Sequence, residues 1–136
     1  MANCAHAIRL FTGIEPASQT LVTCFIDGSY SLAFRIVLAA IVVLGAPLFE
    51  EPLFRGIMFR GFATAMPQWA AMTLSGAIFA LVHVNAASFL PLCFLGIAFA
   101  VLYRRTGTLL APMLAHALFN AFNMVLLLAF PEVEAW

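Results

Sequence analysis

Residues 31–64 read SLAFRIVLAAIVVLGAPLFEEPLFRGIMFRGFAT, a long apolar run with two adjacent acids near its middle. About 20 apolar residues in a helix cross a hydrocarbon core of about 30 Å, so this run predicts a membrane helix. Pro47 and Pro52 each remove a backbone donor and predict a kink. Glu50 and Glu51 are costly in such a helix. Ionisable groups in membrane helices face a bundle interior or a water-filled cavity and are candidates for function.

The composition extends this conclusion to the whole chain. Hydrophobic residues make up 65% of the 136 residues and the mean hydropathy is +1.06, whereas soluble domains contain about 45–50% apolar residues. We therefore expect an integral membrane protein that contacts the lipid bilayer. The formal net charge is zero and lysine is absent, which argues against a nucleic-acid partner. The three cysteines have neither zinc-finger nor disulfide-framework spacing.

Apolar periodicity divides the chain into helical segments joined by short connections. The fold class predicted is all-α, a polytopic membrane helical bundle of about four to five transmembrane helices. We expect an N-terminal tail or interfacial segment, a membrane core and an acidic C-terminal tail, at 1–30, 31–131 and 132–136. Within the core the expected helices cover about 31–64, 69–87, 89–103 and 108–130.

The arginines predict how the bundle is oriented. Counting helices places the connections at 65–68 and 104–107 on one face of the membrane. Most of the core arginines cluster toward that face: Arg55, Arg60, Arg104 and Arg105. The positive-inside rule makes this face cytoplasmic. Arg35, near the other end of the first helix, is the exception and is expected to extend its side chain outward.

The acidic pair predicts a general base. Glu51 and Arg55 are four residues apart and therefore share a helix face, while Glu50 is rotated by about 100° from Glu51. One arginine pairs well with one carboxylate. Burial and the adjacent negative charge then disfavour the ionised form of the other acid, which makes Glu50 a usable base. We assign Glu51 as the acid that Arg55 keeps ionised and oriented. A structural ion pair with a spectator acid is the alternative.

Three further polar residues lie in apolar helices. His116 and Asn120 are four residues apart and project from one side of the last helix, and Phe79 and His83 repeat that spacing earlier. Histidine can polarise water or bind a metal, and asparagine can donate to an oxyanion. Either residue can equally be an interhelical hydrogen-bond partner. Glu50, His83 and His116 are also donor types that zinc accepts, so zinc is a candidate cofactor, although no HExxH motif is present.

The predicted depths of these residues differ. A rise of 1.5 Å per residue places His116 ~11 Å from the Arg105 turn, Glu50 ~15 Å from Arg60 and His83 ~20 Å from Trp69. The three side chains can therefore meet only if helices are tilted or shortened, or if the stretch 84–91 is not helical.

Four stretches together resemble the CPBP family, which includes type II CAAX prenyl endopeptidases and the bacteriocin-processing or immunity proteins also called Abi. Glu50-Glu51-Pro52-Leu53-Phe54-Arg55 resembles its EExxxR motif, and Phe79-Ala80-Leu81-Val82-His83 its FxxxH motif. His116-Ala117-Leu118-Phe119-Asn120 resembles its HxxxN/D motif. The run from Tyr103 to Pro112 is similar to the one that precedes the last motif in bacterial members. The resemblance covers about residues 46–125.

The resemblance implies an intramembrane endopeptidase of a bacterial inner membrane, with its cavity open to the cytoplasm. Its substrate would be a membrane-associated or prenylated CAAX-type protein or a leader peptide. Glu50 and His83 would activate water, and His116 and Asn120 would support the oxyanion, with Glu51, Arg55 and Phe79 in support. The family is labelled metalloprotease, but a glutamate mechanism without a catalytic metal is also argued for it. Members usually carry further N-terminal helices, so an oligomer or a partner subunit is a further expectation.

Two other functions compete with proteolysis. One is a non-catalytic membrane scaffold or bacteriocin self-immunity protein of the same family, which predicts that Glu50→Ala leaves function intact. The other is a small ion or solute carrier that uses the acidic pair as a proton site. The absence of an inverted repeat weakens the carrier hypothesis.

Overall fold

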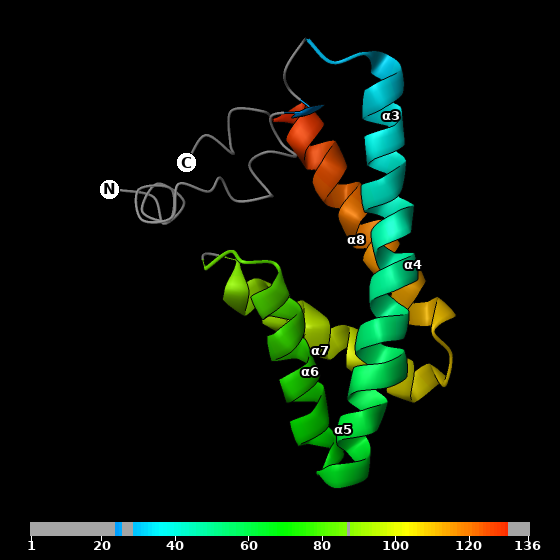
Figure 1. Cartoon of the computed structure of the whole chain (residues 1–136), viewed down its shortest axis with the longest axis vertical. Helices are drawn as coiled ribbons and strands as arrows, with labels where there is room; N and C mark the ends of the chain where they lie inside the picture. The colour runs from blue at the N-terminus through cyan, green and yellow to red at the C-terminus, as the bar shows by residue number, and fades with distance from the viewer. Residues whose placement is uncertain (1–23, 26–28, 87, 131–136) are drawn as a thin grey trace.

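The computed structural model describes residues 24–25, 29–86 and 88–130, and the part described from Leu32 onward forms four helical rods (Figure 1). The first is one continuous rod of 34 residues, Leu32–Ala65. It consists of α3 (Leu32–Ala40), η1 (Ile41–Gly45), α4 (Ala46–Glu51), η2 (Pro52–Phe59) and α5 (Arg60–Ala65). The others are α6 (Gln68–Val82), α7 (Phe89–Thr106) and α8 (Leu110–Ala129). The predicted all-α membrane bundle is confirmed.

Length and composition allow three of these rods to cross a membrane: Leu32–Ala65, Phe89–Thr106 and Leu110–Ala129. The fourth, α6, has 15 residues, which corresponds to about 22 Å at 1.5 Å per residue. It is therefore shorter than a hydrocarbon core of about 30 Å. Apolar side chains such as Leu48, Phe94 and Leu118 are exposed on the rods, as expected where lipid surrounds them.

The first rod passes through both of its prolines without a break, and the disturbance takes the form of π-helical turns. The segment η1 precedes Pro47, and η2 begins at Pro52. Proline has no N–H, so one carbonyl before each proline loses its backbone donor. In a π-turn, where each bond spans five residues, that carbonyl lies five residues before the proline. Such π-helical segments occur frequently at functional sites. The acidic pair lies in α4, between the two segments.

The ends of the rods follow local chemistry. The Ser31 hydroxyl accepts a hydrogen bond from the Phe34 amide at the start of α3. The α7 helix continues through Arg104 and Arg105, three residues beyond the predicted end, and stops at Gly107. Gly107 adopts a left-handed φ of 70° that favours glycine at this position. Pro112 lies in the first turn of α8. Its missing N–H removes no hydrogen bond within the helix there, because the first N–H groups of a helix have no helical partner.

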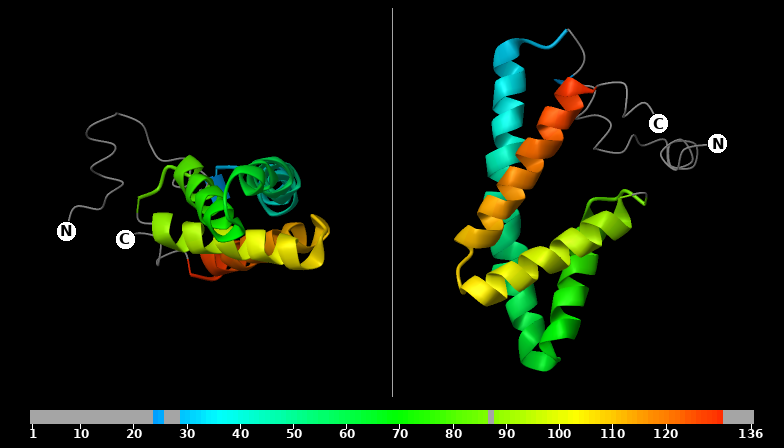
Figure 2. Two further views of the ribbon diagram at one scale, coloured as in Figure 1. Left: turned by 90° about the horizontal axis from the view of Figure 1, so that it is seen from below. Right: turned by 180° about the vertical axis from the view of Figure 1, so that it is seen from behind.

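The α6 helix ends at Val82, five residues before the predicted end. Val84 has a φ of 49°, and this left-handed conformation is unusual for a β-branched residue. Residues 83–86 and 88 are accordingly non-helical. Figures 1 and 2 show that α7 then crosses the molecule obliquely. The predicted depths of Glu50, His83 and His116 allow their side chains to meet only if helices are short or tilted or the connection is not helical. The structure has a short α6, a non-helical connection and a tilted α7.

Candidate active site

Glu51 is the centre of the polar site. Its side chain is fully buried, and one carboxylate oxygen, Oε1, accepts two hydrogen bonds. Arg55 Nη1 donates to it over 2.9 Å from the next turn of the same rod. His116 Nδ1 lies 2.8 Å from the same oxygen and donates from α8. The predicted Glu51–Arg55 pair is thus confirmed, and the structure adds His116 as a second partner of Glu51.

Arg55 is fully buried as well, and three aromatic rings enclose it. Its guanidinium carbon lies 5.7, 4.7 and 5.1 Å from the ring centroids of Phe54, Phe79 and Phe99. Cation–π attraction is strongest for such a desolvated cation. Arg55 Nη2 also donates to the Gly96 carbonyl oxygen over 2.9 Å. The guanidinium therefore joins the first rod to both α6 and α7.

Gly96 reaches Arg55 because α6 and α7 touch at a pair of glycines. A Cβ added to Gly96 would lie 2.8 Å from the Gly76 Cα, and one added to Gly76 would lie 2.9 Å from the Cys93 carbonyl oxygen. Small residues allow such close approach of membrane helices. Gly76 and Gly96 are not among the residues predicted from the sequence, although glycine within an apolar helix is a usable signal. The contacts of Phe54 and Phe99 with Arg55 are not predicted either, and nothing in the sequence distinguishes these two phenylalanines from the others.

We expect Gly96→Ala to destabilise the protein by about 1–3 kcal/mol, because an added methyl overpacks this crossing. The α6 and α7 backbones would separate, and the Gly96 carbonyl would move away from Arg55. Gly61→Ala is the matched control, since no atom lies within 4 Å of a Cβ built there. Thermal unfolding in detergent, followed by circular dichroism, measures both. Equal melting temperatures for the two variants would contradict the role assigned to the crossing.

His116 directs its second nitrogen toward Glu50. Because Nδ1 donates to a carboxylate, the neutral imidazole carries its lone pair on Nε2. Nε2 lies 4.0 Å from Oε2 of Glu50, beyond direct hydrogen-bond length. The Glu50 side chain is 30% exposed, although Oε2 itself is buried without a partner among the described residues. Glu50 is thus the acid of the pair that solvent can reach.

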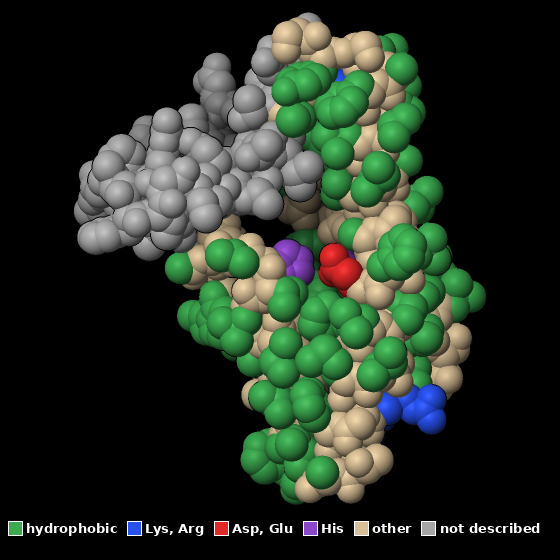
Figure 3. Space-filling model, in the orientation of Figure 1, with side chains coloured by type: hydrophobic (Ala, Val, Ile, Leu, Met, Phe, Trp, Pro, Cys, Tyr) green, Lys and Arg blue, Asp and Glu red, His purple; other side chains and the backbone are tan. Residues whose placement is uncertain are grey.

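Figure 3 shows an acidic and a histidine side chain close together on one face, beside a hollow in the middle of the molecule. Glu50 and Glu51 are the acids within the described ranges, and Glu51 is fully buried. Of the two histidines, His83 is exposed and His116 is buried, with 3% of its surface accessible. The polar site is therefore accessible from the surface at Glu50 and His83.

His83 caps the end of α6 and is oriented by its own helix. Its Nδ1 lies 2.7 Å from the Phe79 carbonyl oxygen and donates to it, which leaves Nε2 as the free nitrogen. The Phe79 ring packs near both histidines, with its centroid 4.7 Å from that of His83 and 5.7 Å from that of His116. Phe79 thus supports both imidazoles, and the FxxxH spacing places His83 at the rim of the site.

Asn120 contacts the first rod one helical turn beyond His116. Its Nδ2 donates to the Val42 carbonyl over 2.9 Å. In η1 the Ala46 amide bonds to Ile41, so the π-helical partner of Val42 would be Pro47, which has no N–H. Asn120 therefore satisfies a carbonyl that Pro47 leaves without a backbone donor. His116 and Asn120 together fix α8 along the first rod.

We expect Asn120→Ala to lower stability by about 1–3 kcal/mol, the cost of leaving a partly buried carbonyl unsatisfied. Asn123→Ala is a matched control on the same helix. The Asn123 Nδ2 donates to the Phe119 carbonyl at an exposed position, so its loss is expected to change stability by less than about 0.5 kcal/mol. Denaturant titration of both variants tests this difference. A similar loss in both would show that the Val42 contact adds no stability.

The arrangement does not fit a zinc ion held by Glu50, His83 and His116. Within the described ranges, no three His, Cys, Asp or Glu side chains lie close enough together to hold a metal ion. Catalytic zinc sites use three protein ligands, whereas in the described part of the chain no third His, Cys, Asp or Glu side chain completes a site with Glu50 and His116. The Oε1 oxygen of Glu51 is already occupied by Arg55 and His116. We therefore derive no chemical step through a metal.

The fold and this site define an all-α membrane protein with a buried carboxylate–arginine–histidine cluster. A family model described as type II CAAX prenyl endopeptidase Rce1-like matches residues 32–122, which is more than half of the chain. The chain belongs to this family, and the CPBP membership predicted from its motifs is confirmed. The matched region contains Glu50, Glu51, Arg55, His83, His116 and Asn120.

Two curated bacterial proteins are similar to the chain. YdiL of Bacillus subtilis (strain 168), whose name assigns it provisionally to the membrane peptidases, is 30% identical over 101 residues, which are 74% of this chain and 40% of YdiL. The membrane-embedded CAAX protease MroQ of Staphylococcus aureus (strain USA300) is 36% identical over 93 residues, covering 63% of this chain and 37% of MroQ. The chain thus spans about two fifths of the length of these relatives. No solved structure matches it at a significant level.

Proposed function

We propose that this chain is the catalytic part of an intramembrane endopeptidase in which Glu50 activates water. One observation carries the proposal. The partly exposed Glu50 carboxylate lies 4.0 Å from the Nε2 of His116, and the other ring nitrogen of His116 bonds to the buried Glu51. This geometry supports a general base beside an oriented imidazole, at a depth in the membrane where polar groups are otherwise rare.

The reaction needs few participants. The oxygen of a water molecule attacks the peptide carbonyl carbon while Glu50 accepts one of its protons. Glu50 then gives that proton to the amide nitrogen as the C–N bond breaks, which leaves a new carboxyl end and a new amine. A small rotation of the Glu50 side chain brings Oε2 within hydrogen-bond reach of His116. The imidazole can then share the proton during this transfer.

Glu51 and Arg55 keep the imidazole ready. A carboxylate bonded to one ring nitrogen fixes the tautomer and the orientation of a histidine. Arg55 neutralises that carboxylate, so that Glu51 stays an acceptor in an apolar surrounding. Asn120 is proposed to support the oxyanion, as the family resemblance implies. His116 is proposed to do so once its Nε2 has received the shared proton and can donate it. One hydrogen on Asn120 Nδ2 is engaged by Val42, and the second remains available.

The substrate class proposed is a membrane-associated peptide or protein, including prenylated CAAX-type tails and leader peptides. The similar protein MroQ is named a CAAX protease, and this name supports the proposed class. Arg60, Arg104 and Arg105 support a cytoplasmic orientation in a bacterial inner membrane.

Cleavage by the purified chain in detergent tests the proposal. A peptide library that includes farnesylated CAAX peptides would be incubated with wild type and with Glu50→Gln, each with and without a chelator, and the products read by mass spectrometry. We expect cleavage by wild type with or without chelator and none by the variant. Cleavage that survives in Glu50→Gln would remove the base, and loss with chelator would require a metal. No cleavage by wild type would favour the non-catalytic scaffold or immunity role.

A further inference from the structure

A second concave site lies away from Glu50, between the end of the first rod and the end of α7. Its volume is about 480 Å³, and it is a shallow depression that opens broadly to the surface. The site begins at Phe59, nine residues after Glu50, which is about 14 Å along a helix. None of the residues that line it belongs to the acidic and histidine cluster. The pocket is therefore separate from the candidate active site.

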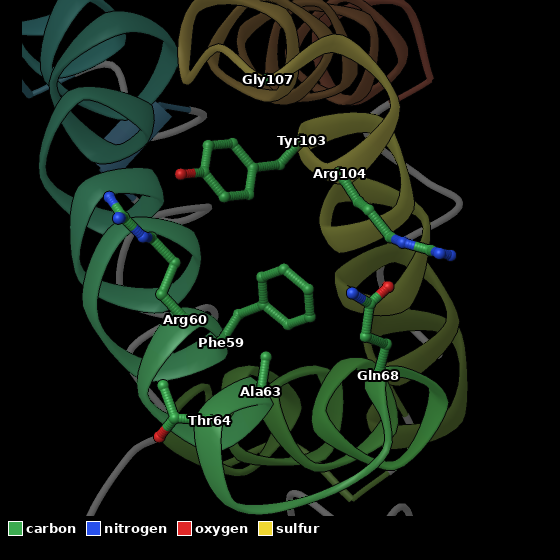
Figure 4. A pocket seen from close by; sticks show the side chains of 8 residues that line it. All are labelled: Phe59, Arg60, Ala63, Thr64, Gln68, Tyr103, Arg104 and Gly107. Carbon is green, nitrogen blue, oxygen red and sulfur yellow. The ribbon is translucent and has the colours of Figure 1, made fainter.

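The walls of this pocket combine cations with an apolar floor. Phe59 and Ala63 form the floor, and the Tyr103 ring meets Phe59 edge-on with centroids 6.2 Å apart. Figure 4 shows Arg60 and Arg104 on opposite sides, with both guanidinium groups directed outward and the Tyr103 hydroxyl directed toward the Arg60 side. The Gln68 amide points toward the Arg104 side (Figure 4). Guanidinium, amide and hydroxyl groups can all donate hydrogen bonds to a phosphate oxygen.

The charges of this pocket are not neutralised from within the described part of the chain. Arg60 and Arg104 are exposed, and neither pairs with an acid there. The described acids are Glu50 and Glu51, which belong to the other site. Arg105 adds a third cation beside the pocket without lining it. An anion is therefore the ligand that this pocket complements.

We propose that this pocket binds the headgroup of an anionic phospholipid at the membrane surface. The exposed Arg60 and Arg104 side chains would turn inward and contact the phosphate from its two sides. Gln68 and Tyr103 would donate to the remaining polar groups, and the glycerol end would rest on Phe59 and Ala63. The pocket lies at the ends of membrane-length rods, where headgroups are found. Juxtamembrane arginines gain binding energy from anionic lipid. The inference goes beyond peptidase activity and does not depend on it.

Trp69 is a built-in reporter for this site. It follows Gln68 in the chain and is 73% exposed, and the sequence contains one other tryptophan, Trp136. In a Trp136→Phe background, the full chain would be reconstituted into vesicles that contain acyl-brominated phosphatidylglycerol or acyl-brominated phosphatidylcholine at equal mole fractions. Bromine quenches nearby tryptophan fluorescence, so stronger quenching by the anionic lipid measures a preference for it.

We expect wild type to prefer phosphatidylglycerol, and Arg60→Gln or Arg104→Gln to lower that preference about fivefold each. Arg105→Gln is the matched control and should lower it less than about twofold, since Arg105 carries the same charge but does not line the pocket. Ala63→Leu, which fills the floor without a change in charge, should also lower it. Circular dichroism verifies that each variant is folded.

Three results would overturn the proposal. Equal quenching by both lipids in wild type would show that the pocket does not select an anionic headgroup. An Arg105→Gln effect as large as that of Arg104→Gln would show diffuse surface attraction. Relief of the quenching by soluble glycerol phosphate would show a site for a free phosphate compound instead of lipid. Because the readout is fluorescence, failure here leaves the cleavage experiment unaffected.

Discussion

Replacing Arg55 with alanine is expected to cost about 3–5 kcal/mol of folding free energy, the usual effect of removing one partner of a buried ion pair. Glu51 would remain fully buried, with its charge facing only the His116 hydrogen bond. The Gly96 carbonyl and three aromatic rings would lose their shared cation as well. The melting temperature in detergent and the midpoint of denaturant unfolding measure this loss.

Two further variants serve as comparisons for Arg55→Ala: one keeps the charge at position 55, and the other removes an arginine elsewhere. Arg55→Lys keeps the positive charge but has no planar fork to reach both Glu51 and Gly96, so we expect an intermediate loss of stability. Arg105→Ala removes an exposed arginine from α7 and should change stability by less than about 0.5 kcal/mol. If Arg55→Ala unfolds at the same midpoint as wild type, the buried pair does not stabilise the bundle.

The local parts of this site were predictable from the sequence. The Glu51–Arg55 contact follows from helical spacing alone, and the same spacing places His83 close to Phe79. By contrast, the bond from His116 to Glu51 joins residues 65 positions apart, and helical periodicity carries no information on it. The motifs indicated that these residues belong to one site, but they did not show which acid each histidine faces.

The features that the sequence did not predict are those that depend on tertiary packing or on backbone strain. The enclosure of Arg55 by Phe99 depends on the angle at which α7 crosses α6, and that angle depends on Gly76 and Gly96 touching. The early end of α6 depends on the left-handed backbone of Val84, a residue type that predicts the opposite. The disturbance at Pro47 was predictable, but its repair by Asn120 from another helix was not.

The two adjacent acids should respond in opposite ways to loss of charge. We expect Glu50→Gln to reduce kcat by about 10²–10⁴, the range for a lost general base. Its melting temperature should stay close to that of wild type, because the Glu50 side chain is 30% exposed and Oε2 has no partner in the described part of the chain. Peptide cleavage and thermal unfolding, measured on the same preparation, test the two halves of this expectation.

Glu51→Gln should instead lower stability and activity together. The amide would leave Arg55 as an uncompensated buried cation, which costs about 3–5 kcal/mol, and it would weaken the orientation of His116. If Glu51→Gln is stable but inactive and Glu50→Gln is unstable, then Glu51 is the general base and Glu50 is the structural acid. Such an exchange of roles would contradict the placement of the base at the solvent-reachable acid, because Glu51 is fully buried and its Oε1 already accepts from Arg55 and His116.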